Sequence, residues 1–398
     1  MISRDIIIIG QQAWDTDIGS NCKNIALELS KSNRVLYVNS PLDRITLFKN
    51  RADPKVQQRI AVIKGKQSGL VKIQENLWNL YPDCLVESIN WIKNEKVFNF
   101  LNKRNNVKFA DAIVKGIKGL DFKDYLLFND NEIFKGFYLN TLLNPYLSIY
   151  YSRDYMLAVD YWKRHGERLE PLLIASNDIC MANSVYLADY CKQYNENSYD
   201  IGQGCDLEIF KDDVNAEKPM ELRDIHTPII GYVGALQSIR LDIELITHLA
   251  NQRKDWTIVL VGPEDDEFKN SGLHQLSNVV FTGIKPMESL PLYMQYFDVC
   301  INPQLVNQVT IGNYPRKVDE YLAMGKPTVA TETRAMEIFK EHVYLAQSKE
   351  DYVSCIEKAL TEDSLTLQEN RKSFAASHSW ENCILKMYAA IEMTINKK

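Results

Sequence analysis

Short apolar runs rich in β-branched residues alternate with helical patterns along this chain, and they form two series. The first series runs from residues 6–9 to residues 199–202, and the second runs from residues 229–233 to residues 328–331. Alternation of this kind predicts parallel sheets covered by helices on both faces. We therefore predict an α/β protein with two doubly wound domains that face a central cleft.

The segment between the two series marks a domain boundary. Residues 206–226 are polar and charged and show no periodicity. A chain of 398 residues is also long enough for two cores of ordinary size. We predict an N-terminal domain at residues 1–204, a linker at 205–227, a second domain at 228–375 and a C-terminal helix at 376–398.

Several classes of protein are disfavoured by simple patterns. No apolar run approaches the roughly 18 residues that span a bilayer. The four isoleucines from Ile6 to Ile9 are too few for the core of a signal peptide. The eight cysteines include no C-x-x-C pair and no zinc-like spacing. Scattered thiols without an export signal favour a cytoplasmic protein without structural zinc.

Basic residues concentrate in one stretch of the first domain. Residues 1–200 hold 26 Lys and Arg against 23 Asp and Glu, whereas the remainder holds 20 against 29. Between Arg44 and Lys72 there are eight basic residues and one acid, with Leu47 and Phe48 among them. This stretch predicts docking on an anionic membrane surface. A solvated face, or a patch that steers an anionic acceptor, is the alternative.

The loop after the first predicted strand holds one group of candidate site residues. Gly19 and Ser20 fall at a helix start, where free N–H groups and the helix dipole favour an anion. Together with Asp17 they are candidates for a phosphate- or acceptor-binding loop, although Ser20 also suits a plain N-cap. A G-x-G-x-x-G fingerprint is absent. Asp15 and Asp17 form a D-x-D pattern, which in other enzymes binds a metal and a diphosphate.

Two loops of the second domain carry further candidates. Gly234 follows the strand at 229–233 and permits close backbone approach, while Arg240 precedes the next helix and is placed to reach a phosphate. Lys317 lies in the first turn of a helix, where a cation opposes the helix dipole unless an anion is bound. Glu320 is three residues further on and shares that face. Surface ion pairs remain the alternative for Arg240 and Glu320.

The surroundings of Lys317 resemble a known family. The run PRKVDEYLAMGKPTVAT resembles the signature of family 4 glycosyltransferases, which have the two-domain GT-B fold of Rossmann-like domains. The likeness extends through YVGAL, DWTIVLVGPE, NVVFTGIKPMESLPLYMQYFDVCINP and NQVT, and includes DICMANSVYLADY and GCDLEIF. The segments WDTDIGSN and VLYVNSPLD are similar to a branch that builds bacterial surface polysaccharides, such as capsule. The resemblance implies that the C-terminal helix crosses back to the first domain.

By this resemblance, Glu320 would hold the ribose of a nucleotide-sugar, while Lys317 and Arg240 would hold its diphosphate. The loop at residues 309–314, with Thr310 and Asn313, would flank the phosphate and the sugar. Fixed cations at a helix N-terminus stabilise a departing diphosphate, so neither a metal nor another cofactor is expected.

Many relatives carry a further glutamate, eight residues before the one equivalent to Glu320, that contacts the donor sugar. Gly312 occupies that position here. Asn307, Gln308 and Asn313 are candidates for contacting the sugar instead. The sugar is therefore left open.

Asp130 and Asp154 are the catalytic candidates of the first domain. Each follows a predicted strand, and relatives often place an acidic group near the acceptor hydroxyl. A turn residue for Asp130 and a helix cap for Asp154 are the alternatives.

Together these features predict an enzyme that moves a sugar from a nucleotide-diphosphate sugar to a glycan or lipid-linked acceptor, with retention implied by the resemblance. It would work in the cytoplasm, peripherally on the inner face of the membrane, and no nucleic-acid partner is expected. A non-catalytic nucleotide-sugar-binding scaffold, which the missing glutamate favours, and an epimerase of the same fold are the alternatives.

Overall fold

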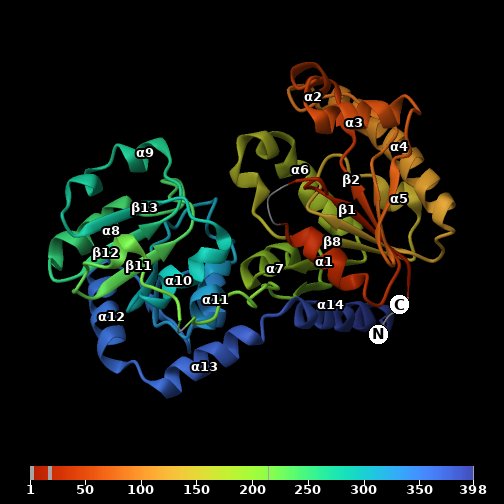
Figure 1. The fold of residues 1–398 in the computed structure, drawn as a ribbon. Coiled ribbons are helices and arrows are strands. Elements are labelled where there is room, and N and C mark those ends of the chain that lie inside the picture. Colours follow the sequence, from red (N-terminus) through yellow and green to blue (C-terminus); the bar gives the residue numbers. More distant parts are fainter. Residues whose placement is uncertain (1–3, 17–19, 214, 398) are drawn as a thin grey trace. The chain divides into compact units, whose positions relative to one another are not determined.

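An eight-stranded sheet forms the centre of the first of two units (Figure 1). The computed structural model describes residues 4–16, 20–213 and 215–397. The strands follow the order β10 (Ser198–Asp200), β9 (Ile179–Ala182), β8 (Leu147–Ser152), β7 (Leu126–Asp130), β1 (Ile6–Gly10), β2 (Val35–Asn39), β5 (Leu77–Leu80) and β4 (Leu70–Gln74). Only β4 at the edge pairs antiparallel with its neighbour. Strands β1, β2, β7 and β8 are buried along their length, as parallel strands between two helical layers must be.

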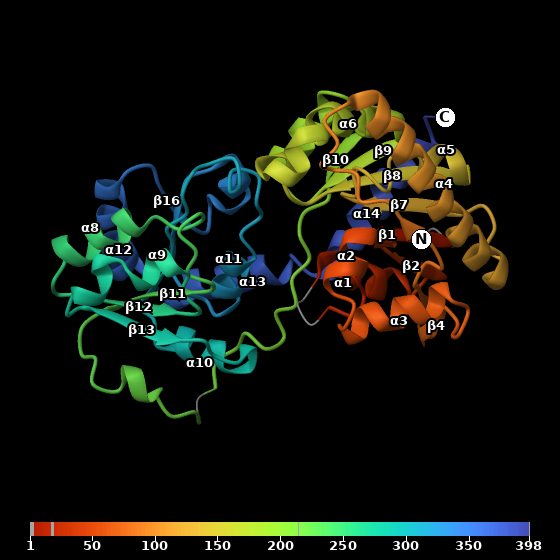
Figure 2. The same cartoon turned by 90° about the horizontal axis from the view of Figure 1, so that it is seen from above.

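Helices cover both faces of this sheet (Figure 2). They are α1 (Asn21–Leu29), α2 (Arg44–Lys49), α3 (Pro54–Ile63), α4 (Glu95–Leu120), α5 (Leu139–Leu143), α6 (Asp160–Ser176), α7 (Val185–Lys192) and α14 (Trp380–Ile395). A short pair, β3 (Leu42–Asp43) with β6 (Leu85–Val86), and the 3-10 turn η1 (Met156–Ala158) complete the unit. One core joins Ile7 and Leu36 of the sheet to Phe109 of α4.

A six-stranded parallel sheet forms the centre of the second unit. Its order is β13 (Val279–Gly283), β12 (Thr257–Val261), β11 (Ile229–Val233), β14 (Val299–Asn302), β15 (Thr328–Thr331) and β16 (Tyr344–Ala346). Counted along the unit, this is the order 3-2-1-4-5-6 of nucleotide-binding Rossmann folds. In such a sheet the ligand crevice lies where the strand order reverses, which here is between β11 and β14.

The helices of the second unit are α8 (Ile243–Gln252), α9 (Asp266–Lys269), α10 (Leu290–Gln295), α11 (Arg316–Ala323), α12 (Lys349–Glu362) and α13 (Leu365–Ala376). Four 3-10 turns join them: η2 (Met220–Leu222), η3 (Gly272–Gln275), η4 (Met287–Ser289) and η5 (Arg334–Phe339). Gly231 in the middle of β11 is required by packing, because a Cβ there would lie 2.0 Å from the Phe297 ring.

The division between the units differs in detail from the sequence-based prediction. The first unit consists of Met1–Gly202 with Cys383–Lys398, and the second consists of Gln203–Asn382. Residues 205–227 are not a separate linker, because Phe210 and Leu222 are buried in the core of the second unit. α14 belongs mainly to the first unit, where the Tyr388 hydroxyl accepts a hydrogen bond from Asn33 after α1.

Two segments near the unit boundary are fixed to α11 inside the second unit. The backbone N–H of Cys205 donates to the carbonyl of His378 at 2.8 Å. Asp319 of α11 is fully buried, and its carboxylate lies 2.6 Å from Nδ1 of His378 and accepts from the Cys205 thiol at 3.3 Å. The helix with Lys317 and Glu320 is therefore hydrogen-bonded to both chain segments that lead to the unit boundary.

Some boundaries and strands were not anticipated. β4, β5 and β16 have no clear strand pattern in the sequence, and the pattern of α4 does not show its full length of 26 residues. Among the described residues, no helix combines the length and the apolar character needed to cross a bilayer.

Replacement of Asp319 by Ala is expected to lower the free energy of unfolding of the second unit by roughly 1–3 kcal/mol, because His378 and Cys205 lose a buried acceptor. Urea unfolding followed by intrinsic fluorescence measures this change. Asp266→Ala, at an exposed acid of the same unit, is the control and should change stability by less than about 0.5 kcal/mol. Equal effects of the two substitutions would contradict an anchoring role for Asp319.

Candidate functional site

The candidate donor site lies at the carboxyl ends of β11 and β14, the neighbouring strands at which the order of the second sheet reverses. Residues 234–242 follow β11, and residues 303–315 follow β14. The two loops are joined by backbone and side-chain hydrogen bonds: Leu305 N–H donates to the Arg240 carbonyl at 2.8 Å, and the Asn307 amide donates to the Ile239 carbonyl at 2.8 Å. They therefore form one connected edge.

Lys317 of α11 reaches across to the end of β11. Its ammonium donates to the Tyr232 hydroxyl at 2.7 Å and lies 4.7 Å from the centre of the Tyr232 ring. The Tyr232 hydroxyl in turn lies 3.3 Å from the Ala235 carbonyl. The cation that opposes the helix dipole is thus held over the loop after β11 by a polar contact and a cation–π contact.

Gly234 is the residue that allows this approach. Its φ of +142° is a conformation that side chains rarely adopt, and a Cβ would lie 3.2 Å from Cε and 3.3 Å from Nζ of Lys317. Gly262, at the end of β12, packs behind it, because a Cβ on Gly262 would lie 2.0 Å from the Gly234 carbonyl oxygen. Both glycines are needed for the position of Lys317.

Glu320 lies one turn further along α11 and is only partly exposed. Burial raises the pKa of its carboxyl above the ordinary value of 4.5, while the charges of Arg316 and Lys317 act in the opposite direction. Within the described residues its carboxylate makes neither a hydrogen bond nor an ion pair with another side chain. The expected pair with Arg316 is therefore not formed, and both oxygens remain open to a ligand.

The other predicted donor residues are placed differently. Arg240 is exposed at the end of its loop. Asn313 is half-buried in the loop before α11. Thr310 is buried, its hydroxyl bonds to the Leu305 carbonyl, and its backbone N–H bonds to Asn307. Thr310 therefore shapes the loop rather than facing a ligand, and the same bonds occupy the Asn307 side chain.

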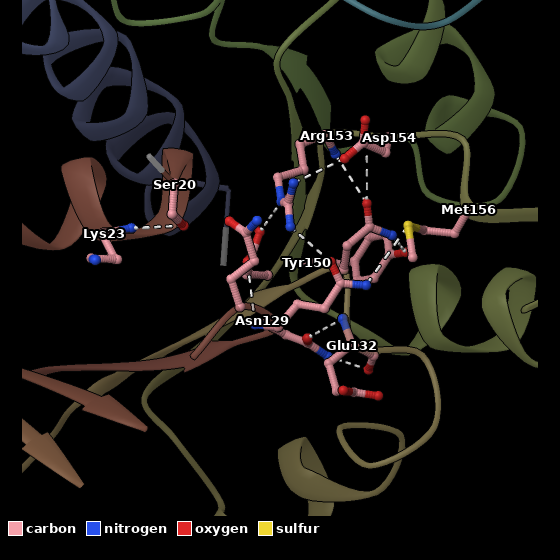
Figure 3. Close-up of polar contacts among 12 residues, drawn as sticks. Ser20, Lys23, Asn129, Glu132, Tyr150, Arg153, Asp154 and Met156 are labelled. Atoms are coloured by element: carbon pink, nitrogen blue, oxygen red, sulfur yellow. Dashed lines mark hydrogen bonds and ion pairs between the residues drawn. The ribbon is translucent and has the colours of Figure 1, made fainter. Parts of the chain in front are cut away.

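The first unit brings its polar candidates together at the corresponding position of its own sheet, between β1 and β7 (Figure 3). Arg153 follows β8 and donates through Nε to Asp130 at 2.9 Å, through Nη1 to Asp154 at 2.9 Å and through Nη2 to the Gln11 side chain at 2.7 Å. Burial alone would lower the pKa of Arg153, but the charges of Asp130 and Asp154 raise it. The arginine is a permanent cation.

This geometry separates the two predicted catalytic carboxylates. The Asp130 side chain has no exposed surface and also accepts from the Gln11 N–H at 3.3 Å. The catalytic role of Asp130 stays a prediction, and in this structure its buried carboxylate positions Arg153. The Asp154 side chain is 43% exposed and keeps access to solvent. Since α6 begins at Asp160, Asp154 is not the helix cap that was the alternative.

A buried network supports this loop from below. The Asn131 side chain accepts from the Arg153 N–H and donates to the Tyr150 hydroxyl at 2.8 Å. Tyr150 donates to Glu170 of α6 at 2.6 Å, and burial raises the pKa of Glu170. The Arg153–Asp154 loop is thus connected to α6.

The loop after β1 supplies fewer site residues than predicted. Ser20 is buried and is the N-cap of α1, accepting from the Lys23 N–H, as Figure 3 shows. Asp17 and Gly19 lie outside the described residues. Both carboxylate oxygens of Asp15 accept hydrogen bonds from Arg59, at 2.8 and 2.9 Å. Asp15 is therefore engaged by a cation of the chain itself.

Sequence reasoning missed three residues that shape these candidate sites. In the sequence, Arg153 is distinguished only by its place directly after an apolar run that predicts a buried strand. Tyr232 resembles any other strand residue, and Gly262 is one of 17 glycines. A polar or glycine residue at the end of a predicted parallel strand was the one signal that marked Arg153 and Gly262.

Comparison with known proteins finds a family match within the second unit. Residues 227–362 match the family model for glycosyl transferases group 1. The putative teichuronic acid biosynthesis glycosyltransferase TuaH of Bacillus subtilis is 28% identical over 198 residues. The alignment covers 48% of this chain and 49% of that protein, so the chain spans about half the length of this curated relative.

Solved structures match the whole chain. Sucrose-phosphate synthase from Thermosynechococcus elongatus has a TM-score of 0.68 at 16% identity and covers 99% of this chain and 100% of that one. HepE of Anabaena, solved with UDP-glucose, has a TM-score of 0.61 at 16% identity over 98% and 99% of the chains. The predicted GT-B fold, with two Rossmann-like domains, is confirmed.

Substitution of Glu320 by Gln is expected to raise the thermal stability of the ligand-free protein at neutral pH. A carboxyl whose pKa is higher in the folded state destabilises that state once it is ionised, so the gain should fade as the pH falls through the raised pKa. Thermal denaturation of both proteins at neutral and mildly acidic pH measures it. Glu288→Gln, at an exposed glutamate, is the control. A loss of stability at neutral pH would contradict the open carboxylate.

Proposed function

We propose that this chain, whose residues 227–362 match the family model for glycosyl transferases group 1, transfers a sugar from a nucleotide-diphosphate sugar to a glycan or lipid-linked acceptor. The second unit would bind the donor and the first unit the acceptor. The similarity to a putative teichuronic acid glycosyltransferase supports a role in the biosynthesis of a surface polysaccharide.

The unpaired carboxylate of Glu320 beside Lys317 is the observation that carries this proposal. Glu320 accepts the two ribose hydroxyls, as an acidic residue does in dinucleotide sites. Lys317, the exposed Arg240 and a backbone N–H group at the start of α11 face the diphosphate. Pro315 at that helix start offers no side-chain cap, and the Arg316 and Val318 N–H groups donate to the Tyr314 and Pro315 carbonyls, which leaves the Lys317 N–H for an anion.

The same groups act on the reaction. Breakage of the bond between sugar and phosphate leaves negative charge on the diphosphate, and preorganised cations stabilise that charge. One cation–phosphate contact at ~4 Å contributes roughly 4 kcal/mol at an effective dielectric constant near 20, before desolvation. We infer a reaction that requires no metal. Retention of configuration is part of the proposal through the family resemblance.

UDP-sugars are the first donors to test, because HepE of Anabaena was solved with UDP and with UDP-glucose. Gly312 leaves no carboxylate at the position where many relatives contact the sugar. Asn307 is engaged within its loop, so Gln308 and Asn313 remain as the candidates for that contact. In the first unit, Asp154 is the group proposed to face the acceptor hydroxyl.

Glu320→Ala is expected to weaken donor binding by on the order of 1.5–3 kcal/mol, because the ribose hydroxyls lose their acceptor. Lys317→Ala should lower kcat more than affinity if its contact strengthens as the diphosphate departs. Calorimetry with UDP-glucose and steady-state kinetics separate the two effects, with Lys340→Ala at an exposed lysine of the same unit as control.

Wild-type kinetics in both variants would refute the assignment. Activity should also survive EDTA, whereas dependence on a metal would favour the D-x-D pattern of Asp15 and Asp17. Donor binding without turnover on any acceptor would support the scaffold, and conversion of the free donor to its epimer would support the epimerase.

We further propose that the first unit docks on an anionic membrane surface through α2, α3 and the turn that follows α3. Phe48 is 87% exposed near the end of α2. The side chains of Lys49, Arg51, Lys64 and Lys66, which follow it in the sequence, are also exposed. Arg59 and Arg44 are paired with Asp15 and Glu87, so they contribute less than the sequence indicated. Each remaining cation near such a surface is worth about 1 kcal/mol.

Vesicle co-sedimentation tests this docking. Binding should require anionic lipid, fall with added salt, and weaken when Lys49, Arg51 and Lys64 become Ser. The control replaces Lys211, Lys254 and Lys340, three exposed lysines of the second unit, with Ser. Equal recovery on neutral and anionic vesicles would leave the basic stretch as a solvated face.

A further inference from the structure

The first unit contains a pocket that is lined by none of the predicted site residues. It has a volume of about 650 Å³. Its lining comes from the start of α2, residues 87–91, and the side chains of Gln11, Ser40, Asn102, Asn105, Glu132, Phe134, Lys135, Asp160, Tyr161, Trp162 and Arg164. We call it the N-terminal pocket. All of its lining residues belong to the first unit, so its shape is a property of that unit alone.

Aromatic rings provide much of its wall. Trp91 is 66% exposed and Tyr161 is 54% exposed, which is unusual for side chains of this size. The Trp91 ring is held by a hydrogen bond from its indole N–H to the Ser88 carbonyl at 2.8 Å. Trp162 stacks on Phe134, with ring centres 5.1 Å apart and an angle of 20°. The pocket therefore offers rigid aromatic faces before any ligand arrives.

The polar groups of the pocket are mainly acceptors. Asp160 is exposed at the start of α6. The carboxylates of Asp43, Glu87 and Glu132 also line the pocket. These acceptors suit a ligand with many hydroxyl donors.

The charge of the lining disfavours an anionic ligand. Four carboxylates contribute to it, against two cations: Asp43, Glu87, Glu132 and Asp160 against Lys135 and Arg164. Glu87 is paired with Arg44, and an acidic excess still remains. A phosphate or a uronate would meet net repulsion there, and a lipid chain would bury these polar groups without partners. An uncharged sugar meets neither cost.

We propose that the N-terminal pocket binds an uncharged saccharide, the acceptor end of a growing glycan. The negative faces of Trp91 and Tyr161 attract the weakly positive C–H side of a sugar ring, while the exposed Asp160 accepts from its hydroxyls. Gln11 lines the pocket and also bonds to Arg153, so the saccharide lies next to the loop with Asp154. The assignment of this saccharide as an acceptor rests on the proposed glycosyltransferase function.

An array of immobilised oligosaccharides tests this inference with the full-length protein. The array carries neutral, uronate-containing and phosphorylated glycans. We expect binding to neutral glycans, weakened about tenfold or more in Trp91→Ala and largely retained in Trp91→Phe. Phe100→Ala removes an aromatic ring that is 67% exposed outside the pocket, and it should bind like the wild type. Thermal denaturation confirms that each variant is folded.

Absence of neutral-glycan binding, preference for uronate or phosphorylated glycans, or full binding by Trp91→Ala would overturn the inference. UDP-glucose binding, measured in parallel, separates it from the proposed function. Trp91→Ala should keep donor binding, and Glu320→Ala should keep glycan binding. If the protein binds glycans through Trp91 but binds no nucleotide-sugar, the result would support saccharide binding in the N-terminal pocket and contradict the proposed glycosyltransferase function.

Discussion

The approach of Lys317 to Gly234 is the contact on which the donor-site geometry depends. It requires β11 and β14 to be neighbours, because only then does the helix after β14 start beside the loop after β11. It also requires a residue without a side chain at 234, and another at 262 behind it. Tyr232 then holds the ammonium in place. In the proposed reaction, a cation fixed before the ligand arrives would lose little entropy on binding and would stabilise the departing diphosphate without reorganisation.

Glu320 depends on the same arrangement. A half-buried carboxylate with a raised pKa and no partner costs the fold some stability. Asp319 beside it is fully buried and satisfied by His378 and Cys205. One of two adjacent acids of α11 thus anchors the helix, and the other has no partner among the described residues, as the proposed ribose contact requires.

The second unit was more predictable from sequence than the first, for physical reasons. Its strands are short apolar runs with glycines or polar residues at their ends, and Lys317 was conspicuous because it opposes a helix dipole. In the first unit, α4 buries Asn102, Asn105 and Asn106, so its apolar pattern was too weak to show its length. The role of Arg153 depends on three side chains that come from separate strand ends, which no local pattern encodes. Likewise, Phe210 and Leu222 pack into the second core although the surrounding sequence is polar.

Hydrogen exchange of the full-length protein, with and without UDP, tests the central claim most directly. If the edge formed by β11 and β14 binds the nucleotide, exchange should slow in residues 234–242 and 303–320, and the slowing should be lost in Glu320→Ala. Unchanged exchange in both segments, or slowing confined to the loop after β1, would contradict the account.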